Sequence, residues 1–429
     1  MEFGLRPTVQ KSDNPPASPQ APNPARCYIP HLVVSVLFAT AALAPAQVPV
    51  PGGGSRLFPS DTAILESDDA RKDLPCTVTS IKPQLGFDLK FHSGYDVSIP
   101  LKELAGETNE LTMVFRVFPA GTPEAATYLS QRIGVPQITE DSKGDAYLHG
   151  NFDIGEGKYH VDWLMRDRNE HFCSSSWDIE AALPGKDKEM ALDITANAIE
   201  PVDTEPFKQE PPVPRDAEGP PLNVKVMVNF APQNALSATL QPLDTNALVS
   251  ILRNIARDPH IGKFSIVAFN MQEQRVVYRQ DEVSQINFPA LGDALHSLDL
   301  GTVNLSKLQQ KHGDTDFLTD LMKREMKSNP DQPDAVIIAG PKVMLDDSVP
   351  PDALKEIGEP KFPVFYMNYN LNPQSNPWRD AIGSAVKTLK GAEYTISRPR
   401  DVFFAWTDII GRIVKLKFGK TAAASATVP

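Results

Sequence analysis

The strongest constraint on the fold is an alternation of strand and helix patterns that runs from Asn223 to Lys417. The apolar strand patterns NVKVMVNF and PDAVIIAG alternate with amphipathic helix patterns such as LDTNALVSILRNIARDP, which Asp244 is expected to cap. Continuously apolar strands are typical of parallel sheets that helices cover on both faces. We therefore predict a doubly wound, mostly parallel α/β sheet for this part of the chain.

A different pattern precedes it. Between residues 75 and 185, segments such as KYHVDWLM and HFCSSSWDIEA alternate apolar and polar residues, and a short polar connection, RDRNE, separates them. Alternation with a period of two and short polar turns are typical of antiparallel strands. The sequence predicts an antiparallel, β-sandwich-like domain over residues 75–185.

Proline-rich and aperiodic segments mark the expected boundaries. Seven prolines fall between Pro201 and Pro221, and such segments act as semi-rigid spacers, so residues 186–222 are predicted to be a linker. Residues 47–74 and 418–429 lack apolar periodicity. We expect a flexible segment and a disordered tail there.

The N-terminal segment has the pattern of an export signal. The apolar run HLVVSVLFATAALA follows Arg26 and ends at Ala44, before Pro45 and Ala46. A positive flank, a short apolar run and an A-x-A site predict a signal peptide with a long leader over residues 1–46, and a secreted or periplasmic protein. The run is shorter than the roughly 20 residues that span a bilayer, so no membrane span is expected after cleavage. Retention as an N-terminal anchor is the alternative.

Cysteine content and charge limit the remaining possibilities. Of the three cysteines, Cys76 and Cys173 follow the signal segment, and in an exported chain they could form one disulfide or stay as two buried thiols. The net charge of -12 disfavours nucleic acid as a partner.

The sequence contains no recognisable catalytic motif. The patterns G-x-S-x-G, G-x-x-x-x-G-K-S/T, H-E-x-x-H and C-x-x-C are absent. His149, His160 and His171 lack metal-ligand spacing and are interpreted as surface residues. We therefore expect a protein that is not an enzyme and that carries no cofactor.

The element order and three segments, KFSIVAFN, GDTDFLTDL and PDAVIIAG, carry a family resemblance. Residues 223–417 resemble a von Willebrand factor A domain, of the related type found in exported acidobacterial proteins. The resemblance implies a Rossmann-like fold and a site for a divalent cation at the strand ends. In the family, that site is made by D-x-S-x-S after the first strand, a threonine before a middle helix, and an aspartate after the fourth strand.

The matching positions have largely lost these ligands. The first motif begins at Asn229 and ends at Gln233, and the last aspartate is replaced by Gly340, whereas the threonine is kept as Thr315. Mg²⁺ prefers oxygen ligands that include one or two carboxylates, so the resemblance implies a degenerate metal site that binds no metal. We expect Asn229, Gln233, Thr315 and Asp316 to lie in loops that contact a protein partner.

Two questions stay open at this point. Asp314, Asp316, Asp346 and Asp347 could rebuild a cation site, or the first two could stabilise a helix N-terminus while the others are solvated. The function that we predict is an exported, non-enzymatic protein–protein interaction or adhesion protein. The alternatives are a secreted hydrolase with an unrecognised active site in residues 75–185, and a structural component of the cell envelope.

Overall fold

A computed structural model describes most of the chain after the expected signal segment. It describes residues 48–49, 58–67, 70–215, 220–234, 237, 239–298, 300, 312–326, 332–345, 349–358, 360–374 and 380–419. The predicted signal peptide and most of the predicted tail lie outside these residues. None of the helices described there is long and apolar enough to cross a bilayer.

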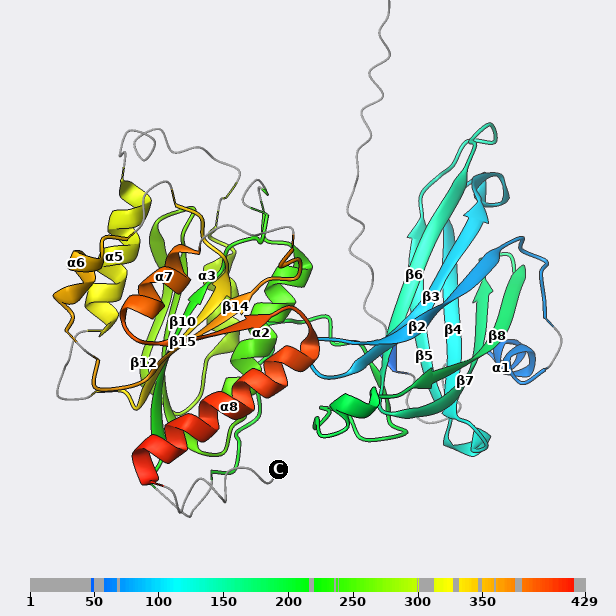
Figure 1. The fold of residues 1–429 in the computed structure, drawn as a ribbon. Coiled ribbons are helices and arrows are strands. Elements are labelled where there is room, and N and C mark those ends of the chain that lie inside the picture. Colours follow the sequence, from blue (N-terminus) through cyan, green and yellow to red (C-terminus); the bar gives the residue numbers. More distant parts are fainter. Residues whose placement is uncertain are drawn as a thin grey trace, which may run out of the picture. The chain divides into compact units, whose positions relative to one another are not determined.

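The first half of the described chain forms two antiparallel sheets (Figure 1). The five-stranded sheet has the order β1 (Val48–Pro49), β5 (Thr127–Val135), β4 (Asn109–Pro119), β7 (Gly157–Arg166) and β8 (Phe172–Ala181). The four-stranded sheet has the order β2 (Thr77–Leu85), β3 (Phe91–Pro100), β6 (Asp145–Ile154) and β9 (Ile199–Pro201). Short 3₁₀ helices occur at Leu101–Leu104, Pro123–Ala125 and Gly185–Asp187.

The two sheets share one apolar core. Tyr95 on β3 packs against Phe115 on β4 and Trp163 on β7, with ring centroids 5.6 and 5.1 Å apart. Phe152 on β6 lies 5.7 Å from Phe115. All four rings are fully buried, so alternate residues of strands in both sheets face this core. The prediction of an antiparallel, sandwich-like region is confirmed at this level.

The segment expected to be flexible contains ordered elements. Helix α1 spans Pro59–Leu65, with proline at its start. Its Leu65 packs with Val114 and Leu164, whose side chains lie on the outer face of the five-stranded sheet. The buried Asp61 accepts a hydrogen bond from Arg166 Nε at 3.2 Å. The prediction that residues 47–74 are flexible is therefore wrong for α1. It relied on the lack of apolar periodicity, whereas α1 is held by distant partners such as Arg166, 105 residues from Asp61 in the sequence.

The two cysteines after the signal segment are bonded to each other. Cys76 immediately precedes β2 and Cys173 lies in β8, with their Cα atoms 6.3 Å apart and a sequence separation of 97. The disulfide therefore joins the four-stranded sheet to the five-stranded sheet.

The second half forms a six-stranded mixed sheet with helices on both faces (Figure 1). Its order is β12 (Arg275–Val283), β11 (Ile261–Asn270), β10 (Leu222–Asn229), β13 (Ala335–Pro341), β14 (Val364–Tyr369) and β15 (Ala392–Ile396). Only β12 runs antiparallel to its neighbour. Numbered along the chain the order is 3-2-1-4-5-6, that of the doubly wound dinucleotide-binding folds. The prediction of a mostly parallel α/β sheet is confirmed.

Each face of this sheet has its own core. One contains buried residues of α2 (Pro242–Ala256), α3 (Phe288–Leu295) and α8 (Pro399–Phe418). The other contains buried residues of α5 (Gly313–Met326), α6 (Pro351–Lys355) and α7 (Ala381–Thr388). Along the inner strands β11, β10, β13 and β14, side chains alternate between these two cores, which is why these strands are continuously apolar.

The predicted linker is hydrogen-bonded over part of its length. Strand β9 pairs with β6 inside it. Glu210 then accepts from the guanidinium of Arg257 at 2.8 Å, and Arg215 donates to the carbonyl oxygen of Asp258 at 2.8 Å. Residues 186–222 are therefore not a free spacer over their whole length. Proline richness predicts an extended chain, but it does not show whether that chain forms hydrogen bonds with other parts of the protein.

Candidate functional site

The carboxyl ends of β10 and β13 form the edge at which doubly wound folds bind ligands, because the strand order reverses between these two strands. Asn229 ends β10 and is completely buried. Its Oδ1 accepts a hydrogen bond from the backbone N–H of Met271 at 3.1 Å, which fixes the orientation of the amide. Its Nδ2 has no hydrogen-bond partner among the described residues. Asn229 thus presents a neutral amide at the place where the resemblance implies a carboxylate.

Gly340 explains why the second carboxylate is absent. A Cβ atom at Gly340 would lie 2.7 Å from the Cβ of Asn229, and the φ angle of Gly340 is +153°. Neighbouring strands approach here too closely for a side chain, and the backbone conformation itself favours glycine. An aspartate fits neither the space nor the conformation.

A carboxylate does lie near the loop after β10, but it comes from α2. Asp244 is buried and is the third residue of that helix, which Gln241 caps, so its prediction as the N-cap is wrong. Burial raises the pKa of Asp244, although the backbone N–H groups of Gln233 and Gln241 donate to its carboxylate and act in the opposite direction. Gln233 therefore contacts the start of α2 through its backbone.

The other predicted site residues, Thr315 and Asp316, lie in α5, so the prediction that they lie in a loop is wrong. Thr315 is buried, and its carbonyl oxygen accepts from Thr319 Oγ1 at 2.6 Å. Asp316 is exposed in the first turn of the helix, as is Asp314, which accepts a hydrogen bond from Gln274 Nε2. Both carboxylates occupy the position that the helix dipole favours for acidic residues. Asp346 and Asp347 lie outside the described residues.

Two exposed apolar side chains mark the strand-end edge. Leu243, in the first turn of α2, is 53% exposed, and Met344, in the segment after β13, is 68% exposed. Large apolar residues at this exposure are scarce in the described chain. Leu243 lies in a helix and Met344 in the segment after β13, and single exposed apolar side chains are common on protein surfaces. That this edge contacts a protein partner stays a prediction.

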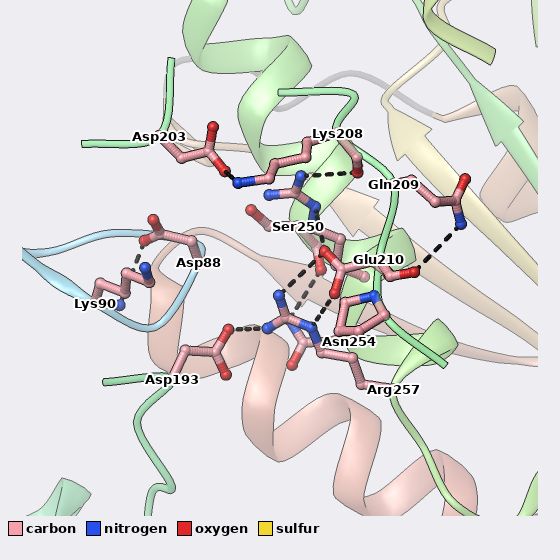
Figure 2. A pocket seen from close by; sticks show the side chains of 12 residues that line it. Asp88, Lys90, Asp193, Asp203, Lys208, Gln209, Glu210, Ser250, Asn254 and Arg257 are labelled. Carbon is pink, nitrogen blue, oxygen red and sulfur yellow. Dashed lines mark hydrogen bonds and ion pairs between the residues drawn. The ribbon is translucent and has the colours of Figure 1, made fainter. Parts of the chain in front are cut away.

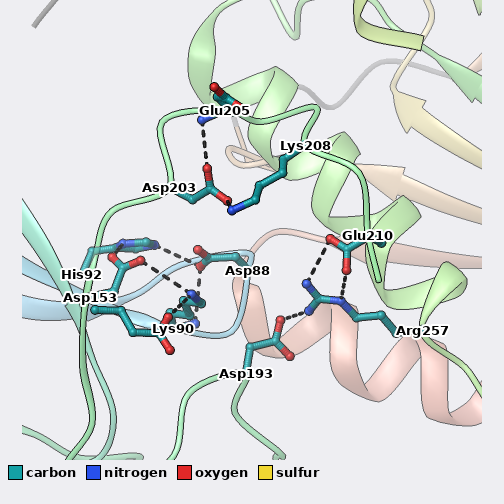
Figure 3. A network of polar contacts seen from close by, with 11 residues as sticks. Asp88, Lys90, His92, Asp153, Asp193, Asp203, Glu205, Lys208, Glu210 and Arg257 are labelled. Atoms are coloured by element: carbon teal, nitrogen blue, oxygen red, sulfur yellow. Dashed lines mark hydrogen bonds and ion pairs between the residues drawn. The ribbon is translucent and has the colours of Figure 1, made fainter. Parts of the chain in front are cut away.

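A second site, missed in the sequence, lies on the β2–β3 hairpin (Figure 3). His92 on β3 stands opposite Asp153 on β6, and its Nδ1 donates to Asp153 Oδ1 at 2.6 Å. On the other side of the ring, Nε2 lies 3.0 Å from Asp88 Oδ1. Lys90 extends the cluster, with its Nζ 2.7 Å from Glu200 Oε2 and 3.9 Å from Asp153 Oδ2.

The hairpin turn holds Asp88 against the ring. The backbone N–H of Gly86 donates to the carbonyl oxygen of Lys90 at 2.8 Å, and that of Leu89 donates back to Gly86 at 3.0 Å. A Cβ atom at Gly86 would lie 2.2 Å from His92 Nε2, so a larger residue there would displace the His92 ring. The sequence offers only the spacing Asp88-x-x-x-His92 as a signal. The contribution of Asp153 depends on the register of β3 and β6, which residue patterns do not reveal.

Charge pairing dominates the electrostatics of the cluster. Burial by itself lowers the pKa of His92, but hydrogen bonds to Asp153 and Asp88 outweigh it and raise the pKa to about 10. Burial raises the pKa of Asp153 despite its contact with His92. For Asp88, burial acts in the same direction, yet the hydrogen bond from His92 outweighs it and lowers the pKa. The imidazole is therefore a protonated cation between two carboxylates.

This arrangement does not supply a nucleophile. A histidine oriented by a buried carboxylate can act as a general base when a hydroxyl or thiol faces its other nitrogen. In the contacts described for His92, that nitrogen faces the carboxylate of Asp88 instead. The cluster has the donor types of a metal site, since Asp88, His92 and Asp153 offer ligand atoms within 4.8 Å of one another.

A neighbouring pocket of about 190 Å³ is lined by charged side chains that form ion pairs with one another (Figure 2). Glu210 forms an ion pair with Arg253 at 2.9 Å and accepts a hydrogen bond from Arg257 at 2.8 Å, and Arg257 also pairs with Asp193. Because these ions already neutralise one another, a charged ligand gains little there. The larger cavity, of about 510 Å³, is lined by Asp88, His92 and Asp153 among other residues.

Comparisons with known proteins do not identify a family. No family model matches the chain, and no curated protein matches it significantly. Among solved structures, the chain is similar to a calcium-binding mutant of Bacteroides uniformis beta-glucuronidase 2, with 9% identity and a TM-score of 0.17. The match covers 81% of this chain and 32% of the glucuronidase, so the chain spans about a third of that protein's length.

A second similar structure is the PilB minor pilin from Streptococcus sanguinis, with 9% identity and a TM-score of 0.25. That match covers 72% of this chain and 88% of the pilin. A Paenibacillus cycloisomaltooligosaccharide glucanotransferase matches with 10% identity and a TM-score of 0.18, over 76% of this chain and 49% of the enzyme. Similarities at this level carry no argument about function.

Proposed function

We propose that the chain is an exported, non-enzymatic protein that binds another protein through the strand-end loops of a von Willebrand factor A-like domain, without a metal ion in those loops. The strand order supports the fold assignment, since β12 is the single antiparallel strand of a 3-2-1-4-5-6 sheet. The sequence resemblance over residues 223–417 supports it independently. The partner and the compartment are part of the proposal.

The observation that carries the proposal is the character of the strand-end edge. Asn229 is a buried neutral amide, and Gly340 has no room for a side chain. The exposed side chains at the same edge, Leu243 and Met344, are apolar. Burial of exposed apolar surface stabilises protein contacts without any need for a cation.

A matched pair of variants tests this surface. Leu243→Ser with Met344→Ser removes the apolar contacts at the strand-end edge. Leu416→Ser is the control, because Leu416 is also 68% exposed but lies near the end of α8, beside Lys417. Lys417 Nζ pairs with Asp334 at 2.5 Å, just before β13 begins, so the control is at the opposite edge of the sheet.

The measurement is quantitative affinity capture from an envelope extract of the producing organism, in EDTA and in millimolar Mg²⁺. We expect the double variant to lose at least tenfold in recovery of a protein that the wild type and Leu416→Ser capture equally, in both buffers. Equal recovery by all three proteins, or a requirement for Mg²⁺, contradicts the proposal.

A further inference from the structure

We propose that Asp88 and His92 bind a divalent transition metal ion, with Zn²⁺ as the best fit, while Asp153 orients His92 from the opposite side of the ring. This site lies on the β2–β3 hairpin and β6, and its residues are not among those of the strand-end loops. The cavity beside it is, however, also lined by Leu243 of α2. Its protein ligands are one imidazole nitrogen and one carboxylate, both donor types that zinc accepts, and water would occupy the remaining positions.

The spacing of the two direct ligands fits a shared ion. His92 Nε2 and Asp88 Oδ1 are 3.0 Å apart. Two ligand atoms that each lie about 2.0–2.2 Å from zinc are this far apart when the ligand–zinc–ligand angle is roughly 90°. An increase of ~0.4 Å in the distance between the two ligand atoms gives the tetrahedral angle. Asp88 lies on the hairpin turn and is partly exposed, so its side chain can make this adjustment.

Asp153 supplies the support that metal-binding histidines need. Its Oδ1 accepts the Nδ1 proton at 2.6 Å, and the residue is 1% exposed. A buried carboxylate behind the ring fixes the tautomer in which Nε2 is the metal-binding atom. The ion then replaces the proton that Nε2 shares with Asp88, and this proton leaves to solvent.

Charge and space are consistent with a divalent ion. Once the imidazole is neutral, the cluster contains the three carboxylates of Asp88, Asp153 and Glu200 and the one ammonium of Lys90. Its net charge is then -2. The cavity of about 510 Å³ beside the cluster has room for the water molecules that would complete the coordination.

A matched histidine provides the control. His160 also lies between two carboxylates, with Nδ1 2.7 Å from Asp178 and Nε2 3.0 Å from Asp162. Asp162, however, is paired with Arg116 at 3.2 Å, and the Asp178 side chain is 84% exposed. A cation lies beside one carboxylate at both histidines, Lys90 near Asp153 and Arg116 near Asp162. The sites differ in the carboxylate behind Nδ1, because the exposed Asp178 does not hold the ring in place as the buried Asp153 does.

The experiment is calorimetric titration of the full chain, stripped with EDTA and exchanged into chelator-free buffer, with ZnCl₂. We expect one Zn²⁺ per chain. His92→Gln should weaken binding at least a hundredfold, Asp153→Asn about 10–100-fold, and His160→Gln by less than twofold. Far-UV circular dichroism checks the fold of each variant, and Asp88→Asn, which keeps the shape of the turn, replaces His92→Gln if that variant unfolds.

The absence of saturable Zn²⁺ binding overturns the proposal, as does an equal loss in His92→Gln and His160→Gln. Because Leu243 lines the cavity beside the cluster, the Leu243→Ser, Met344→Ser variant is also titrated with ZnCl₂, which separates this outcome from the protein-capture experiment. Zinc binding without any effect of Leu243→Ser and Met344→Ser on capture leaves the metal site standing and removes the proposed function. The reverse result removes only the metal site.

Discussion

At the scale of single residues, Glu325 shows how a buried charge is tolerated between sheet and helix. It lies in α5 and is 3% exposed. Its carboxylate accepts hydrogen bonds from Arg279, from Arg324 at 2.9 Å and from Lys225 at 3.2 Å. Burial raises the pKa of Glu325, but the guanidinium hydrogen bonds outweigh burial, so the pKa is lowered. Loss of this carboxylate leaves three cations without their common partner.

We expect Glu325→Gln to lower the free energy of unfolding at pH 7 by about 3 kcal/mol, the cost of breaking a buried ion pair. Because the folded-state pKa is depressed, the carboxylate stabilises the fold above its unfolded-state pKa of about 4.3. This stability is lost as the pH falls through the folded-state pKa. Urea unfolding of both proteins from pH 7 to pH 3 should therefore show a difference that shrinks below pH 4. A pH-independent difference contradicts the assignment.

Gly340 gives a second prediction at this scale. Alanine at Gly340 places a Cβ atom 2.7 Å from that of Asn229, at a φ of +153°, and we expect a loss of about 2 kcal/mol or more. Gly411, in α8, is the control, because a Cβ atom there meets nothing within 4 Å. Gly411→Ala should stabilise the helix by about 0.5–1 kcal/mol. Denaturant unfolding that shows equal effects for both substitutions argues against a steric role for Gly340.

Residue identities alone predicted the strand-end edge better than the histidine cluster. Asn229 could be placed at a strand end because its strand carries its own apolar pattern. The contacts of His92 depend on Asp153, which is 61 residues away and is brought opposite by the pairing of β3 with β6. Strand register depends on turn geometry and on which faces are buried, and a single sequence fixes neither.

At the scale of elements, local pattern separates what could be predicted from what could not. Strands such as β10 and β13 carry continuous apolar runs and were placed correctly. Helix α1 and strand β9 have only seven and three residues. Elements this short are not stable by themselves, and distant partners decide whether they form. Ordered segments that lie in aperiodic or proline-rich parts of the chain were therefore not predicted from the sequence.

The disulfide carries a prediction at the element scale. Cys76–Cys173 closes a loop of 97 residues and joins the two antiparallel sheets. Chain-entropy arguments give about 4–5 kcal/mol of stabilisation for a loop of this length. Cys76→Ser with Cys173→Ser should lower the unfolding free energy by about that amount, and the wild type should show no reaction of these cysteines with thiol reagents before reduction. Free thiols at both positions in the purified, unreduced protein contradict this prediction.

At the scale of the whole molecule, the two halves of the described chain bury their sheets in different ways. The antiparallel sheets bury one shared core between them. The mixed sheet buries both faces under helices, in two separate cores. Parallel connections must cross from one strand end to the other, so they bring the loops of β10 and β13 to one edge. The topology therefore creates a binding edge, whatever residues occupy it.

The residues at that edge lead to a last prediction. Asn229 and Gly340 supply no carboxylate, and the buried carboxylates of Asp244 and Asp380 already accept backbone hydrogen bonds. A ligand present at a hundred times its dissociation constant adds ~2.7 kcal/mol of stability, which for a domain of about 200 residues raises the Tm by roughly 5–11 °C. We expect less than 1 °C of change in millimolar Mg²⁺, followed by scanning calorimetry against an EDTA reference. Zn²⁺ at the Asp88–His92 site should raise the Tm in the same assay, and His92→Gln should abolish that rise. A Mg²⁺-dependent shift of several degrees that survives His92→Gln would show that the strand-end edge binds a cation after all.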